Sequence, residues 1–131
     1  MTQTLSLRLA PEPEAVAESR HFVCDVLAVW GVYEMLAATV ALLADELVTN
    51  AILHAVPPID LTLNWDDPVL RVEVSDGEDH LPVMVEPPRP AGDGGYGLLL
   101  IERLSHEWGA ARRLGGGKVV WFEMHRNRLQ P

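Results

Sequence analysis

The chain has 131 residues, a length typical of one domain. Hydrophobic residues make up 48% of it and charged residues 22%, which excludes wholesale disorder and collagen-like or low-complexity architectures. Ten basic against nineteen acidic side chains give a formal net charge of -9. Direct binding to nucleic acid or to an anionic membrane needs clustered positive charge, so neither is expected.

The spacing of the apolar residues distinguishes the predicted elements: a period of two indicates a strand, and a period between three and four indicates a helix. Leu5, Leu7 and Leu9 alternate with polar residues as in a half-buried strand, and Pro57-Pro58 ends the longest helical stretch. In chain order, the pattern predicts a strand at 5–9, helices at 12–30 and 33–55, strands at 60–65 and 69–75, a helix at 98–105, and strands at 108–114 and 118–125.

Residues 77–97 fit no regular element because they are rich in proline and glycine, and a segment of this length in a small domain is typical of a functional loop. Residues 126–131 are expected to form a frayed tail. Hairpins with grouped helices predict a single α+β domain over 1–131: a two-layer sandwich of one mixed, mostly antiparallel sheet with three helices on one face.

The single cysteine, Cys24, excludes an intramolecular disulfide and fits a reducing cytoplasm. It is expected to pack on the core side of the first helix. The N-terminus has no secretory pattern, and acidic or amide residues interrupt the apolar stretches well before the roughly 20 residues that span a bilayer. A soluble cytoplasmic protein is therefore expected.

The second helix carries three polar residues on one line, Glu46, Asn50 and His54, at successive i, i+4 positions among leucines. One interpretation is an internal hydrogen-bond network that satisfies these groups. The other is a metal or phosphate site, because an amide oxygen suits Mg²⁺ and a carboxylate can act as a general base. The spacing alone leaves both open.

Two further patterns allow a ligand. Asp76 and Gly77 end a strand, where Asp-Gly is ordinary turn chemistry, yet a carboxylate there can also accept a hydrogen bond from an exocyclic amine. Residues 92–101 (GDGGYGLLLI) form a glycine-rich loop that runs into a helix, so the free amides near Gly97 to Leu99 can point at a phosphate chain. The spacing is neither that of a Walker loop nor that of a dinucleotide loop.

Together, the Glu-x-x-x-Asn helix, the Asp-Gly after a strand and the Gly-x-Gly-Leu helix start resemble the ATP-binding domain of the gyrase and histidine-kinase ATPase superfamily, the Bergerat fold. More narrowly, the chain looks like the bacterial anti-sigma factor serine/threonine kinases. The resemblance covers essentially the whole chain, from the first helix to the closing GGGKVVWFEM.

The resemblance implies a role for each matching residue. Glu46 would be the general base, Asn50 the Mg²⁺ ligand, and Asp76 with Gly77 the adenine contact. The phosphate contacts would come from the backbone of the second glycine motif, which comprises Gly95, Tyr96, Gly97, Leu98 and Leu99, and residues 77–96 would be the ATP lid.

The resemblance also implies the partners: an anti-anti-sigma protein of the STAS type, whose serine would be phosphorylated, or a sigma factor that would be sequestered, with Arg20 on the partner surface and a homodimer as a further option. The alternative is a non-catalytic partner-switching module. Two departures from the family pattern motivate it: Asp76-Gly77-Glu78-Asp79 lacks a second glycine in register, and Val119 stands where the family often has threonine.

Overall fold

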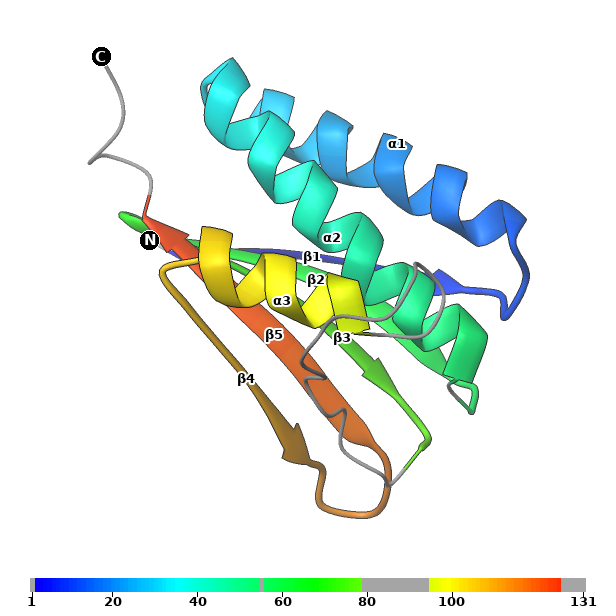
Figure 1. Ribbon diagram of the computed structural model, residues 1–131. Helices are drawn as coiled ribbons and strands as arrows, with labels where there is room; N and C mark the ends of the chain where they lie inside the picture. The colour runs from blue at the N-terminus through cyan, green and yellow to red at the C-terminus, as the bar shows by residue number, and fades with distance from the viewer. Residues whose placement is uncertain (1, 55, 79–94, 126–131) are drawn as a thin grey trace.

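A computed structural model describes residues 2–54, 56–78 and 95–125. In this part of the chain, five strands form one sheet and three helices lie on one of its faces (Figure 1). The order of the elements is the predicted one, β α α β β α β β. The α+β two-layer sandwich is therefore confirmed.

The sheet has the strand order β1-β2-β3-β5-β4, and every pairing among these strands is antiparallel. The sheet was predicted to be mixed, mostly antiparallel, and the expected parallel pairing was wrong. β4 runs in the same direction as β3, but β5 lies between them and separates the two. The strands are β1 (Thr2–Leu9), β2 (Ile59–Asp66), β3 (Val69–Asp76), β4 (Glu107–Arg112) and β5 (Lys118–His125).

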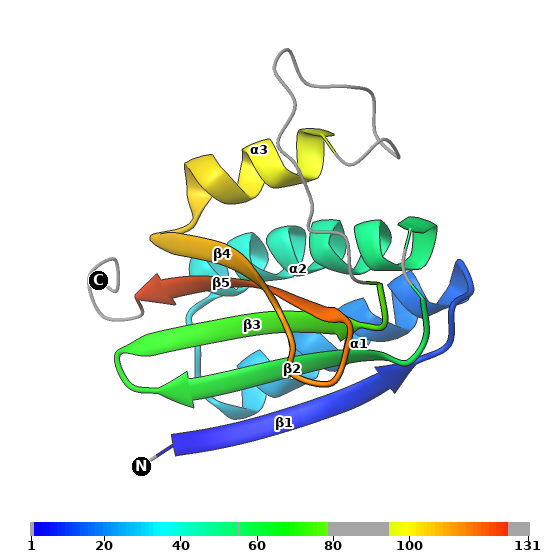
Figure 2. The ribbon, with the colours of Figure 1, turned by 90° about the horizontal axis from the view of Figure 1, so that it is seen from below.

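The helices are α1 (Glu14–Val29), α2 (Glu34–His54) and α3 (Gly95–Leu104). α2 occupies the centre of the helical layer, where it contacts α1, α3, β3 and β5 (Figures 1 and 2). The core forms where the inward residues of the strands meet these helices, and it includes the fully buried Leu61, Val72 and Phe122. Burial of this apolar surface fixes α2 against the sheet and so sets the position of the polar residues that α2 carries.

Helix α2 is long and apolar enough over Glu34–Leu53 to cross a membrane by length and composition. The expectation that acidic and amide residues interrupt the apolar stretches too often for this was therefore too strict. In the fold, α2 is a core helix, because Val40, Leu43 and Val48 are fully buried against its neighbours. Its apolar character is explained by packing on two sides, against α1 and α3 as well as the sheet.

Two sequence expectations change at the ends and faces of helices. Cys24 is exposed, because the buried positions of α1 are Val23, Val26 and Leu27, and residue 24 points off that face. α3 begins at Gly95 and not near Leu98, so Gly95 and Tyr96 belong to the helix and not to the preceding loop.

Most of the predicted lid, residues 79–94, and the predicted tail, residues 126–131, lie outside the described residues.

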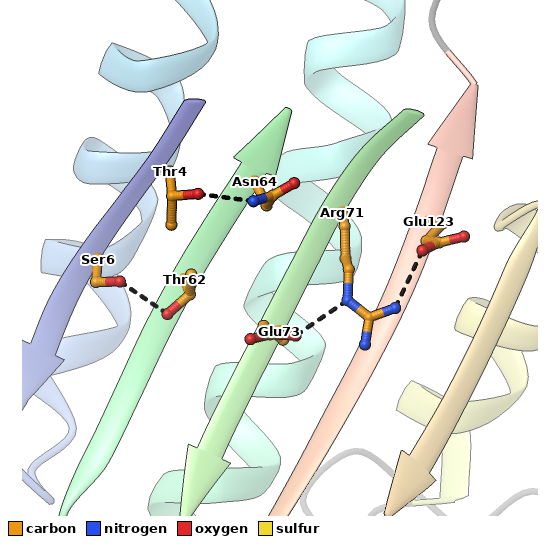
Figure 3. Close-up of polar contacts among 7 residues, drawn as sticks. All are labelled: Thr4, Ser6, Thr62, Asn64, Arg71, Glu73 and Glu123. Carbon is orange, nitrogen blue, oxygen red and sulfur yellow. Dashed lines mark hydrogen bonds and ion pairs between the residues drawn. The ribbon is translucent and has the colours of Figure 1, made fainter. Parts of the chain in front are cut away.

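The sheet face opposite the helices carries polar side chains that bond across neighbouring strands (Figure 3). Arg71 donates to Glu73 on its own strand and to Glu123 on β5, each at 3.0 Å, and its guanidinium lies 4.1 Å from the ring centroid of Trp121. This alternation of apolar inward and polar outward residues is what directs the inward residues of β3 and β5 to the helical face.

Candidate functional site

Glu46 and Asn50 lie one turn apart in the C-terminal half of α2, and both are half-buried. Within the described part of the chain, neither side chain has a hydrogen-bond or ion-pair partner. Burial raises the pKa of the Glu46 carboxyl above its ordinary value, and the charge of neighbouring Asp45 raises it further. The described residues thus do not form the internal network considered from the sequence, and they leave bonding capacity on both side chains unused.

Gly97, in the first turn of α3, packs directly on these two side chains. A Cβ atom at Gly97 would lie 2.9 Å from Glu46 Oε2 and 3.3 Å from Asn50 Nδ2. Any larger residue would therefore push against the carboxylate and the amide. Close approach, and not backbone conformation, requires glycine here. We call Glu46, Asn50 and Gly97 the helix cluster.

The start of α3 supplies backbone donors beside the helix cluster. The first amides of a helix have no partner within it and form a site that favours anions. Leu98 is 1% exposed and Ile101 is fully buried, so apolar contacts anchor this first turn in the core. Leu99 is half-buried, and Gly95 and Tyr96 are described only as helical backbone. Anchoring by Leu98 keeps the amides close to Glu46 and Asn50.

Asp76 ends β3 as a buried carboxylate, only 2% exposed. Its Oδ1 accepts a hydrogen bond from the Glu78 backbone N–H at 2.7 Å. The Lys118 ammonium, at the start of β5, lies 3.0 Å from Oδ2 and 3.1 Å from Oδ1. We call Asp76 and Lys118 the strand-end pair. A buried charge is tolerated only when it is paired, and each of these two charges satisfies the other.

Gly77, which follows β3, and Gly117, which precedes β5, allow the backbone to pack closely beside the strand-end pair. A Cβ at Gly77 would lie 2.9 Å from the Pro57 carbonyl oxygen, and the Gly77 N–H donates to the Val56 carbonyl at 2.6 Å. Gly117 has φ +86°, a conformation that favours glycine, and a Cβ there would clash with the Asp76 carbonyl oxygen. The Gly77 contact also ties the end of β3 to the residues that follow α2.

The helix cluster and the end of β3 lie on the same side of the molecule, where the C-terminal half of α2, the N-terminus of α3 and the end of β3 come together in both views (Figures 1 and 2). The predicted site residues that can be traced in the structure are thus gathered at one end of the fold. Arg20 is not among them. It is exposed on α1 and forms an ion pair with Asp45 at 2.8 Å.

Sequence reasoning assigned no role to Lys118 and noted only that Val119 stands where the family often has threonine. In the structure Val119 lies on the open face of the sheet, opposite Ser75 of β3, and both residues line a polar hollow of about 420 Å³. Lys118 pairs with Asp76 in the register of β3 and β5. The signal was available, because Val120, Phe122 and Met124 are the inward residues of β5 and residue 118 shares their parity.

Chemically, these residues combine a carboxylate of raised pKa, an amide oxygen that suits a hard cation, helix-start amides that suit phosphate, and a buried acceptor at a strand end. A five-stranded antiparallel sheet with three helices on one face is the fold of histidine kinase-like ATPase domains.

Comparison with known proteins gives the family. The model of a histidine kinase-like ATPase domain matches residues 9–124 of the chain. Because this match covers most of the sequence, the chain belongs to the histidine kinase-like ATPase domain family. Among curated proteins no match is found.

The chain is also similar to a crystal structure of the RsbU and RsbW domains of Rv1364c from Mycobacterium tuberculosis, with a TM-score of 0.72 and 19% sequence identity. The similarity covers 94% of this chain and 32% of that one, so this chain spans about a third of the length of the protein it matches. At this identity the similarity supports the fold.

Proposed function

We propose that this domain binds Mg²⁺-ATP and transfers a phosphoryl group to a serine or threonine of a partner protein, as an anti-sigma factor kinase. One observation carries the proposal: Glu46 and Asn50 are half-buried, have no hydrogen-bond partner among the described residues, and lie in contact with Gly97 at the amide-rich start of α3. Membership of the histidine kinase-like ATPase family supports ATP as the nucleotide, and RsbW-type anti-sigma factor kinases are built on a domain of this family.

The residues present fit the nucleotide and its metal ion. The Asn50 side-chain oxygen would hold Mg²⁺, which supplies charge neutralisation at the phosphate oxygens. Backbone amides from Gly95 to Leu99 would bind the phosphate chain, and Asp76 beside Gly77 would accept the adenine amino group. In this assignment residues 1–131 act as one domain, with the lid over about 77–96.

Glu46 would act on the incoming hydroxyl. Its raised pKa makes the Glu46 carboxylate a stronger base than that of an ordinary glutamate. As the serine oxygen bonds to the terminal phosphorus, the bond from that phosphorus to the bridging oxygen breaks, ADP leaves, and the serine proton passes to the Glu46 carboxylate. Positioning and charge neutralisation supply most of the rate in such transfers.

The phosphorylated partner would be a STAS-type anti-anti-sigma protein, and a sigma factor would be the sequestered one, in the cytoplasm and without direct contact to nucleic acid or membrane. The net charge of -9 suits a basic partner such as a DNA-binding sigma factor. Arg20 is exposed on α1 and available to a partner, and a homodimer remains part of the proposal.

The test is incubation of the chain with labelled Mg²⁺-ATP and a candidate anti-anti-sigma protein, with phosphoserine as the readout. Glu46→Ala should abolish transfer and leave ATP binding, measured by calorimetry, nearly unchanged. Glu34→Ala, an exposed glutamate in the first turn of the same helix, is the matched control and should retain transfer. Full transfer by Glu46→Ala would contradict the assignment.

A second candidate is a non-catalytic partner-switching module. It is favoured by the strand-end pair, because Lys118 and the Glu78 N–H already fill most acceptor positions of the Asp76 carboxylate that the nucleotide would need. Calorimetry separates the two functions: no heat with millimolar Mg²⁺-ATP, together with retained binding to the partner, would leave only the binding module.

A further inference from the structure

The strand-end pair places a donor and an acceptor side by side in the buried end of the sheet. The Lys118 ammonium has three N–H groups, and its two contacts with Asp76, at 3.0 Å and 3.1 Å, use at most two of them. The Asp76 carboxylate has about four acceptor positions, and the Glu78 N–H and Lys118 leave at least one unfilled. Each member of the pair therefore keeps capacity for one more partner.

Backbone packing holds this pair in one orientation. Gly117 is in close contact with the backbone of Asp76, Gly77 packs on the carbonyls of Val56 and Pro57, and the register of β3 and β5 places Asp76 opposite Lys118. The Lys118 side chain is 9% exposed, so its long stem is immobilised and its remaining N–H has few ways to turn. A fixed donor beside a fixed acceptor can recognise a flat group that offers the complementary pair.

The edge of a 6-aminopurine offers this complement, because the amino group donates and the neighbouring ring nitrogen N1 accepts. We propose that Lys118 is a second base-recognition residue of the nucleotide site: its ammonium donates to N1 of adenine while Asp76 accepts from the amino group. This inference rests on the proposed binding of ATP. It gives the ion pair a role in binding, beyond neutralising a buried carboxylate.

The test uses calorimetry on the intact chain with Mg²⁺-ATP and with Mg²⁺-1-deaza-ATP, in which a C–H replaces N1. A hydrogen bond to a charged donor typically changes affinity by about tenfold or more, so 1-deaza-ATP should bind the wild-type chain at least about tenfold more weakly than ATP. In Lys118→Met, ATP binding should weaken and the difference between the two nucleotides should disappear. Arg8→Met, which removes an exposed cation on β1, is the control and should retain the difference.

Three results would overturn the inference. Equal affinity of the wild-type chain for both nucleotides would show that nothing donates to N1, and this comparison needs no variant that could fail to fold. Retained discrimination in Lys118→Met would assign the contact to another group and leave Lys118 structural. Failure of the wild-type chain to bind ATP at millimolar concentration would remove the proposed nucleotide binding itself, whereas the first two results would leave it intact.

Discussion

The helix cluster and the strand-end pair are both polar sites built against the hydrophobic core, yet they differ in how their charges are satisfied. Asp76 and Lys118 are buried and bonded to each other, whereas Glu46 and Asn50 are half-buried with no partner in the described residues. Glycine serves both sites, at residue 97 in the first turn of a helix and at residue 117 beside a strand end. The difference teaches that the strand-end pair stabilises the fold through its own ion pair and keeps room for only one further contact, whereas Glu46 and Asn50 make no side-chain bond within the described residues.

The largest effect is expected when the strand-end pair is broken. Lys118→Met leaves the Asp76 carboxylate buried without its cation, which typically costs about 3–5 kcal/mol of unfolding free energy. Urea unfolding monitored by far-UV circular dichroism measures this loss. The double variant Asp76→Asn/Lys118→Met removes both charges and should recover a large part of it. Equal stability of Lys118→Met and the wild type would refute the role of the pair in stability.

The second largest change in stability is expected when Gly97 of the helix cluster is replaced. Gly97→Ala places a methyl group 2.9 Å from Glu46 Oε2, the end of a flexible side chain, and 3.3 Å from Glu46 Cβ and Asn50 Nδ2. The carboxylate can move aside, so the expected cost is at the lower end of overpacking, about 1 kcal/mol. If glycine were present only for flexibility, alanine would instead stabilise the helix by about 0.4–1 kcal/mol. The sign of the change in urea unfolding therefore distinguishes the two explanations.

A double-mutant cycle with Glu46→Ala shows whether the cost of Gly97→Ala comes from the contact with Glu46. Removing the carboxylate takes away the atom only 2.9 Å from the added methyl group, so the double variant should lose less than the sum of the two single changes. Strict additivity would show that the helix cluster is not in contact in solution.

The order of the elements followed from local pattern, whereas the roles predicted for the candidate site residues came from the family resemblance. Periodicity located α2 and placed Glu46 and Asn50 on one line, because helix geometry is fixed by spacing alone. The same reasoning could not determine whether these groups have partners, since that depends on what packs above them. Only the tertiary contact with Gly97 shows how close α3 approaches.

Strand register was the part that local pattern left undetermined. The burial of Lys118 arises from the pairing of β3 with β5, which are more than forty residues apart, and a shift by one residue would have exchanged Lys118 for Val119. A lysine normally indicates a solvated position, so its residue type argued against the position that the structure gives it. The exposed Cys24 is the opposite case, an often-buried residue type one step off the apolar face of α1.

A smaller effect is expected at Glu46, with a definite pH dependence. The folded-state pKa of Glu46 is raised, so ionising this carboxyl costs the folded state more than the unfolded state. Stability therefore falls as pH rises from the ordinary pKa of the carboxyl through the raised one, and the penalty is complete above it. Glu46→Gln removes that penalty and should raise Tm at pH 7, with the gain vanishing near pH 4.

Calorimetric scans of the wild type and of Glu46→Gln across this pH range measure the effect. Glu34→Gln, at an exposed position on the same helix, should show no such pH-dependent gain. A gain at pH 4 as large as that at pH 7 would mean that the glutamine stabilises by packing and that the burial of the Glu46 charge has no energetic cost.

The smallest effects are expected on the open face of the sheet. Its exposed ion pairs are the standard against which the cost of breaking the strand-end pair is compared. Arg71 bonds Glu73 and Glu123 and lies over Trp121, so Arg71→Met should cost about 1 kcal/mol, reduced at high salt. Arg8 is exposed and pairs with the half-buried Asp60, so solvent screens the pair and Arg8→Met should have the smallest effect on stability. Because both arginines point away from the helices, neither change should alter nucleotide affinity. If urea unfolding of Arg71→Met showed a loss as large as that of Lys118→Met, burial would not explain the strength of the strand-end pair.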